Sequence, residues 1–127
     1  MEIYQQIAIL KIEYPRRRQI YDESVAIVQK TNNPDVLFRR MNTVRDFVKW
    51  AFEQQAKGLP IKLDKNKEEM QEEINRFCNF HCVRVAHYVS DHTRKNVFTN
   101  LIRLRGSLIE CSNQDEAYRE IDGLISI

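Results

Sequence analysis

The amino-acid sequence predicts an all-α fold: a single domain over residues 1–127, built as a bundle of five or six helices with short loops. Apolar residues recur at intervals of three and four residues along most of the chain, which is the spacing of a helix face. No segment shows the two-residue alternation of a half-buried strand. The chain has only 3 glycines and 3 prolines, which disfavours an all-β fold rich in tight turns.

Two helices are predicted before residue 31. The first covers about residues 2–13, and its apolar residues follow helical spacing: Ile3, Ile7 and Leu10. Pro15 is expected to end it, because the residue before a proline avoids the α region. Pro15 also suits the first position of a new helix, which is expected to run to about Lys30. This second helix is expected to bury four apolar residues: Ile20, Val25, Ile27 and Val28.

The clearest helix start in the chain is Asn32-Asn33-Pro34-Asp35. An asparagine can cap a helix, proline suits the first helical position, and an acid favours the positive helix end. The third helix is expected to run to about Lys57 and to be stopped by Gly58. Its predicted buried stripe is Leu37, Met41, Val44, Val48 and Ala51, and four aromatic residues widen that face: Phe38, Phe47, Trp50 and Phe52.

The second half of the chain predicts two long helices and a short one. The fourth helix, capped by Asp64, is expected to bury Ile74, Cys78, Cys82, Val85 and Val89 and to end or bend at Ser90–Thr93. The fifth, about residues 94–111, is expected to bury Val97, Leu101, Leu104, Leu108 and Cys111. The last helix, after Ser112, is expected to bury Ala117, Ile121 and Leu124.

Composition narrows the function mainly by exclusion. The chain has 20 basic and 18 acidic residues, a net charge of +2, so it is neither a strongly acidic nucleic-acid mimic nor a strongly basic non-specific binder. Its 3 cysteines are an odd number, which favours free thiols in a reducing compartment. The first residues lack a basic region and a long apolar run, so a cytoplasmic protein is expected.

Potential metal ligands are concentrated in the predicted fourth helix: Cys78, His81, Cys82 and His87. A structural zinc site normally takes a second pair of ligands from another segment, and only Cys111 and His92 remain for that role. Cys78 and Cys82 also lie on the apolar stripe, so they are expected to be small buried core residues. Nothing in the chain resembles a phosphate-binding glycine loop. We therefore expect no metal, no cofactor and no enzyme activity.

Arg16-Arg17-Arg18 is the most unusual local feature. If Pro15 begins a helix, the three cations occupy its first turn and oppose the helix dipole. They are then expected to project into solvent, and replacing them is expected to leave the fold intact or slightly more stable. Four further cations, on the third helix, are expected to extend this basic surface: Arg39, Arg40, Arg45 and Lys49.

The sequence supports two function hypotheses. The first is a non-enzymatic protein-interaction module, self-association included, since aromatic residues left outside the core would form an exposed apolar patch. The second is a nucleic-acid-associated protein that uses the basic surface. Residues from Tyr21 to Phe38 resemble those of small helical proteins from bacterial prophages and mobile elements, a resemblance that implies no residue role. The predicted partner-binding residues are Arg16, Arg17, Arg18, Arg39, Arg40, Arg45, Lys49 and Trp50.

Overall fold

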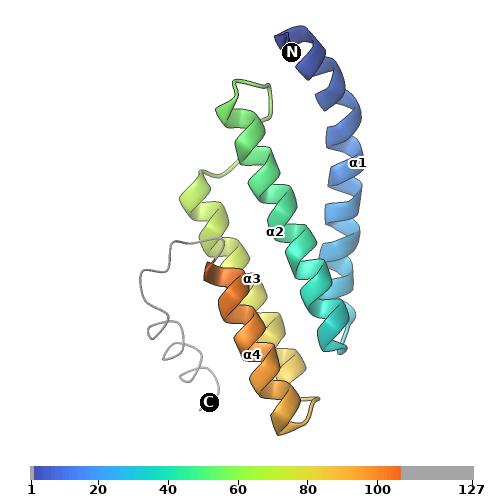
Figure 1. Ribbon diagram of the computed structural model, residues 1–127, viewed down its shortest axis with the longest axis vertical. Coiled ribbons are helices and arrows are strands. Elements are labelled where there is room, and N and C mark those ends of the chain that lie inside the picture. The colour runs from blue at the N-terminus through green and yellow to red at the C-terminus, as the bar shows by residue number, and fades with distance from the viewer. Residues whose placement is uncertain (1, 107–127) are drawn as a thin grey trace.

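The computed structural model describes residues 2–106, and this part of the chain contains four helices and no strand. They are α1 (Ile3–Lys30), α2 (Pro34–Ala56), α3 (Lys67–Ala86) and α4 (Asp91–Gly106). α1 and α2 form one antiparallel pair, and α3 and α4 form another (Figure 1). The predicted all-helical class is confirmed for these residues. The predicted last helix lies outside the described residues, as does the end of the fifth.

The predicted helix boundary at Pro15 is wrong, since α1 runs through this residue without a break. The boundary was expected because the residue before a proline avoids the α region. Inside a helix, proline also cannot donate to the carbonyl four residues earlier, and its ring crowds that carbonyl. Packing against α2 outweighs this local cost. Leu10, before the proline, packs in a cluster with Ala51, and Tyr21, after it, stacks on Phe47 with ring centroids 4.8 Å apart. Both halves of α1 are therefore held on the same neighbour.

The buried face of α1 also differs from the predicted one. Ile20 is exposed, Val25 and Ile27 are half-buried, and of the four predicted residues only Val28 is fully buried. In their place, Tyr14 and Tyr21 turn toward α2 and contact the ring of Phe47. Because α1 is one continuous helix, the same face must pack against α2 before and after Pro15. The isoleucines after Pro15 do not lie on that face.

α2 matches its prediction closely. Asn33 Oδ1 accepts hydrogen bonds from the backbone N–H groups of Asp35 and Val36, at 2.9 and 3.2 Å, which caps the helix start. The helix ends at Ala56, and Gly58 adopts a φ of 82°, a left-handed conformation that favours glycine. The whole predicted stripe is buried: Leu37, Met41, Val44, Val48 and Ala51.

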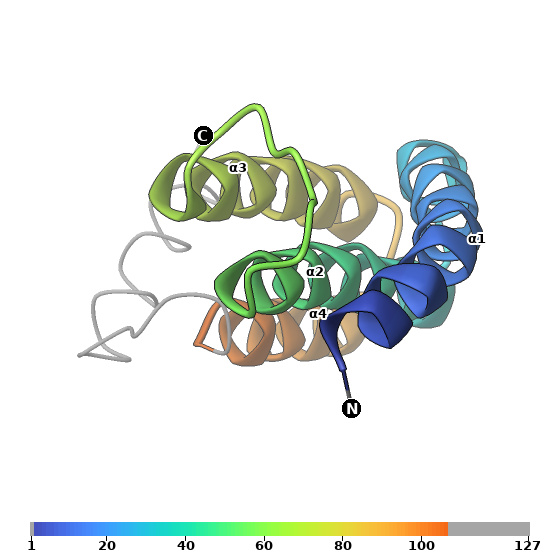
Figure 2. The same cartoon turned by 90° about the horizontal axis from the view of Figure 1, so that it is seen from above.

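α2 lies between the other helices. It packs against α1 on one side and against α3 and α4 on the other, while α1 stands at an edge of the bundle (Figure 2). The connection from α2 to α3 folds back over the end of this core. Leu59 and Ile61 in that connection are buried together with Leu10 and Ala51.

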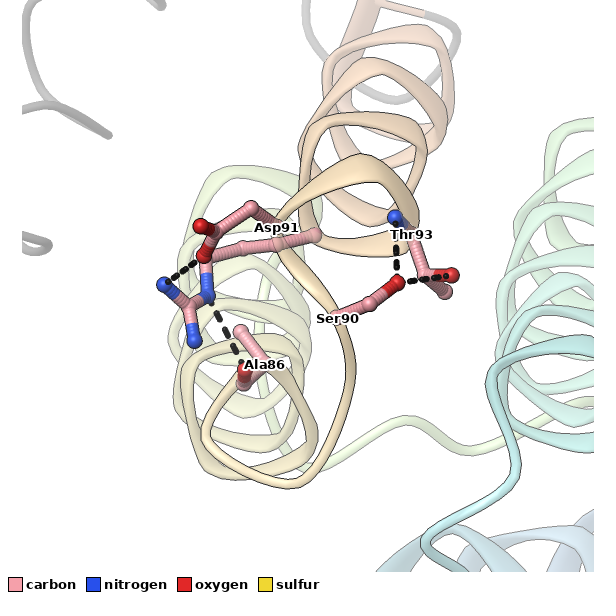
Figure 3. Close-up of polar contacts among 5 residues, drawn as sticks. Ala86, Ser90, Asp91 and Thr93 are labelled. Atoms are coloured by element: carbon pink, nitrogen blue, oxygen red, sulfur yellow. Dashed lines mark hydrogen bonds and ion pairs between the residues drawn. The ribbon is translucent and has the colours of Figure 1, made fainter.

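The start of α3 and the turn into α4 differ from prediction by a few residues. α3 is capped by Asn66, whose Oδ1 accepts from the Glu69 N–H at 2.8 Å, whereas Asp64 lies outside the helix. α4 begins at Asp91, because Ser90 Oγ accepts from the Thr93 N–H at 3.3 Å and caps it earlier than expected (Figure 3). Arg94 Nε also donates to the carbonyl of Ala86 at 3.0 Å, which ties α4 to the end of α3.

The uninterrupted α1 yields a first prediction. Pro15→Ala restores a backbone donor for the Lys11 carbonyl and removes the ring that crowds it, at an exposed position where no packing is lost. We expect the free energy of unfolding to rise by about 1–3 kcal/mol in chemical denaturation. Gln19→Ala, also exposed on α1, is the control and is expected to change stability by less than about 0.5 kcal/mol. A loss of stability in Pro15→Ala would contradict a continuous α1.

Candidate partner-binding surface

α1 leaves a row of isoleucines in solvent. Ile9, Ile12 and Ile20 are 47%, 74% and 40% exposed. Among the described residues, seven large apolar side chains are exposed, and five of them belong to α1: Ile3, Tyr4, Ile9, Ile12 and Ile20. Scattered single apolar residues are normal on a protein surface, but a concentration on one helix is typical of an interaction site.

Three of these isoleucines share one side of α1 with Arg16. At about 100° per residue, these four residues fall within an arc of about 80°, and the centre of that arc is about 130° from the face packed on α2. We call this surface the outer face of α1, and it consists of Ile9, Ile12, Arg16 and Ile20. The helix is therefore apolar on two sides, of which the bundle covers one.

A groove of about 660 Å³ runs beside the outer face, between α1 and the C-terminal half of α2. Ile9 stands on its α1 side, and Trp50 and Leu59 supply apolar surface on the other side. Arg17 lies across the groove, with its guanidinium carbon 4.6 Å from the centroid of the Trp50 ring and its Nε 3.0 Å from Glu13 Oε2. The groove thus joins exposed apolar surface to a stacked arginine and tryptophan.

The structure corrects the setting of Arg16, Arg17 and Arg18. They lie in the middle of a 28-residue helix, so they do not oppose the dipole of a helix start. Arg17 bonds Glu13 and stacks on Trp50, and Arg18 bonds Asp22 at 3.1 Å and lies over the Tyr21 ring. Only Arg16 projects from the outer face. The helix start on which the expected neutral replacement rested is absent, and we now expect replacement of Arg17 or Arg18 to cost some stability, because each covers an aromatic ring.

The predicted cations of α2 do not gather on one side. Arg40 is half-buried, with Nη1 3.5 Å from Ser24 Oγ of α1, and Arg45 bonds Asp46 at 2.9 Å. Lys49 borders a different groove, of about 520 Å³, between α2 and α3, whereas Trp50 lines the groove beside α1. Arg39 is exposed. The structure brings Arg17 and Trp50 together, and it distributes the other predicted site residues around the bundle.

The thiols and histidine of α3 belong to the core. Cys78 and Cys82 are fully buried, and His81 is buried beside them on the same helix. Burial is the main cause of a strongly raised pKa for the Cys82 thiol, and the neighbouring Cys78 adds to it, so Cys82 stays protonated and unreactive at neutral pH. Across residues 2–106, no three His, Cys, Asp or Glu side chains are placed to hold a metal ion.

Arg84 is a residue whose role the sequence analysis missed. Its guanidinium donates to the carbonyls of Val28 and Thr31, at 2.8 and 2.9 Å, and to Asn32 Oδ1 at 2.8 Å. These acceptors lie at the end of α1 and in the turn after it, so Arg84 satisfies helix-end carbonyls that have no partner within α1. Its Nε also donates to His81 Nδ1 at 3.2 Å. No sequence signal indicates this contact, because the partners are more than 50 residues apart.

The isoleucines of the outer face were also missed as surface residues. Ile20 was assigned to the buried stripe of a second helix, and Ile9 and Ile12 were assigned to no surface, because residues 2–30 were expected to form two short helices. The available signal was their number, since α1 has more apolar residues than one face can hold.

Comparisons with protein-family models, with curated proteins and with solved structures found no match to this chain. Within the part of the chain that the structure describes, no helix combines the length and the apolar character that crossing a bilayer requires.

The buried histidine yields a pH prediction. Burial, together with the charge of Arg84, lowers the pKa of His81 below its ordinary value of 6.5, and its Nδ1 must be unprotonated to accept from Arg84. The unfolded chain therefore takes up this proton at a higher pH than the folded protein does. The contribution of neutral His81 to the free energy of unfolding is fully present above about pH 6.5. It is lost as the pH falls from 6.5 to the lowered pKa that His81 has in the folded protein.

This effect is measured by chemical denaturation between pH 8 and pH 5. We expect His81→Gln to flatten the decline in unfolding free energy that the unaltered protein shows. His87→Gln is the control, because His87 is exposed at the end of α3, and it should keep the original profile. Equal slopes for the unaltered protein and His81→Gln would show that His81 does not titrate differently on folding.

Proposed function

We propose that the protein is a non-enzymatic interaction module that binds another protein chain through the outer face of α1. The observation that supports this most is the exposure of Ile9, Ile12 and Ile20 along one side of a 28-residue helix. A helix that is apolar on two sides and covered on one is typical of a helix that packs against a partner.

The chemistry of this surface favours an amphipathic helix as the bound element. The partner's apolar side chains would lie between those of the outer face and reach the groove that the half-buried Trp50 lines. Glu13 and Arg17 at the edge of that groove offer one charge of each sign. Such a rim favours a partner with complementary polar residues beside its apolar stripe.

A second function, binding of nucleic acid, is supported by the local charge. Residues 14–62 include 10 basic and 5 acidic residues. Among the described residues, Arg16, Arg39 and Lys49 form no ion pair, so their charges are available to a polyanion. Arg16 belongs to the outer face of α1, whereas Lys49 lines the groove between α2 and α3, so the two charges do not form one basic surface. This favours the apolar surface over the basic one as the principal site.

The test compares three tagged proteins as baits in extracts of the source cells, with bound proteins quantified by mass spectrometry. Ile12→Glu/Ile20→Glu places charge on the outer face, and Tyr4→Glu/Lys11→Glu is the control, with two exposed substitutions elsewhere on α1. Burial of one isoleucine contributes about 1.5–3 kcal/mol, so we expect the outer-face variant to lose captured partner at least about tenfold. The control variant should retain it.

Two results would count against the proposal. If all three baits capture the same proteins to the same extent, the outer face does not bind partners. If the unaltered protein binds DNA or RNA with a sub-micromolar dissociation constant in about 150 mM salt, the nucleic-acid function takes precedence.

A further inference from the structure

We propose that the outer face of α1 binds a second copy of this chain, with the two α1 helices packed antiparallel about a two-fold axis near Pro15. This inference rests on the proposed function, because it identifies the partner of the same surface. It comes from the order of residues along that surface and from the position of α1 in the bundle.

Four residues set the register. Ile9, Glu13, Arg16 and Ile20 follow one another at intervals of four, three and four residues, the spacing of the contact positions in paired helices. Ile9, Arg16 and Ile20 belong to the outer face, and Glu13 lies at its edge beside the groove. The row therefore has an isoleucine at each end and two opposite charges in the middle.

The row of one copy is complementary to the row of a second copy only when the two helices run in opposite directions. In an antiparallel pair centred between Tyr14 and Pro15, Ile9 of one copy opposes Ile20 of the other, and Glu13 opposes Arg16. The two-fold axis repeats both contacts, giving two isoleucine layers around two ion pairs. A parallel pair would instead place Arg16 against Arg16 and Glu13 against Glu13, which like-charge repulsion disfavours.

The charged residues are free to make these contacts. Arg16 is exposed and forms no ion pair with the other described residues. Glu13 uses Oε2 to bond Arg17, which leaves its other carboxylate oxygen as an acceptor for the second copy. Central ion pairs of this kind contribute more to register and orientation than to affinity.

The bundle leaves room for the second copy. α1 stands at the edge, and α2 lies on one side of it only (Figures 1 and 2). A helix of 28 residues is about 42 Å long, enough for six turns or more of contact. The complementary row from Ile9 to Ile20 covers about three of these turns. We therefore expect an interface smaller than the roughly 800 Å² per partner of a standard one, and a reversible dimer.

The test is sedimentation equilibrium of the full chain over a wide concentration range, in low and in physiological salt. The unaltered protein is expected to approach twice the 15.2 kDa of one chain as its concentration rises. With Arg16→Glu, two carboxylates face each other in each central layer of the dimer. With Glu13→Arg, two guanidinium groups face each other there. Each variant alone is expected to weaken the dimer at least tenfold.

Mixing the two variants gives the sharpest result. In a mixed dimer each carboxylate again opposes a guanidinium group, so an equimolar mixture is expected to dimerise at least about tenfold more tightly than either variant alone. Lys11→Glu, an exposed charge reversal away from the outer face, is the control and should dimerise like the unaltered protein. Circular dichroism of each variant checks that the helix content is unchanged.

A monomeric unaltered protein at every concentration would overturn the proposal, as would a dimer that both single variants leave intact. The first of these results separates the two proposals. If the protein is monomeric but the bait experiment still shows binding through the outer face, the interaction function stands and the second copy is not its partner.

Discussion

The fold depends on the burial of one side of α2. Leu37 and Met41 have no exposed surface, and Val44 is only 2% exposed, in a helix that contacts all three others. Removal of apolar side chains from water is the main favourable term in folding. α2 supplies six of the buried apolar residues: Leu37, Met41, Val44, Phe47, Val48 and Ala51. α1, α3 and α4 all pack against α2, so a change in its apolar stripe would affect its interfaces with all three helices.

This arrangement explains why α1 has an apolar side that the bundle does not cover. α1 has α2 as its main neighbour, and its C-terminal end is fixed further by Arg84 of α3, which bonds the carbonyls of Val28 and Thr31. One side of α1 is therefore enough to hold it in place. The isoleucines on another side contribute little to the bundle, which is why we assign them to binding rather than to stability.

Sequence reasoning succeeded where the determining contacts are local. The cap at Asn33, the stop at Gly58 and the α2 stripe depend on residues within a few positions of one another. It failed at Pro15, where a local preference is outweighed by packing of both halves of α1 on α2. It also missed Arg84, whose partners are distant in sequence.

The candidate site was predictable only in part. Arg17 and Trp50 were identified, but as members of a basic surface and not as a stacked pair beside an apolar groove. Ile20 was assigned to the core, and Ile9 and Ile12 were assigned to no surface, because periodicity identifies apolar sides of a helix without showing which one is covered. When a helix has two such sides, only the position of its neighbours decides between them.

The most direct test of this account compares two substitutions on α1, two residues apart. The free energy of unfolding is measured for Leu10→Ala and Ile12→Ala at a concentration low enough to keep the protein monomeric. Leu10 is 7% exposed and Ile12 is 74% exposed. We expect a loss of about 2–4 kcal/mol for Leu10→Ala and of less than about 0.5 kcal/mol for Ile12→Ala. Equal losses would contradict this expectation, because Ile12 would then be part of the core.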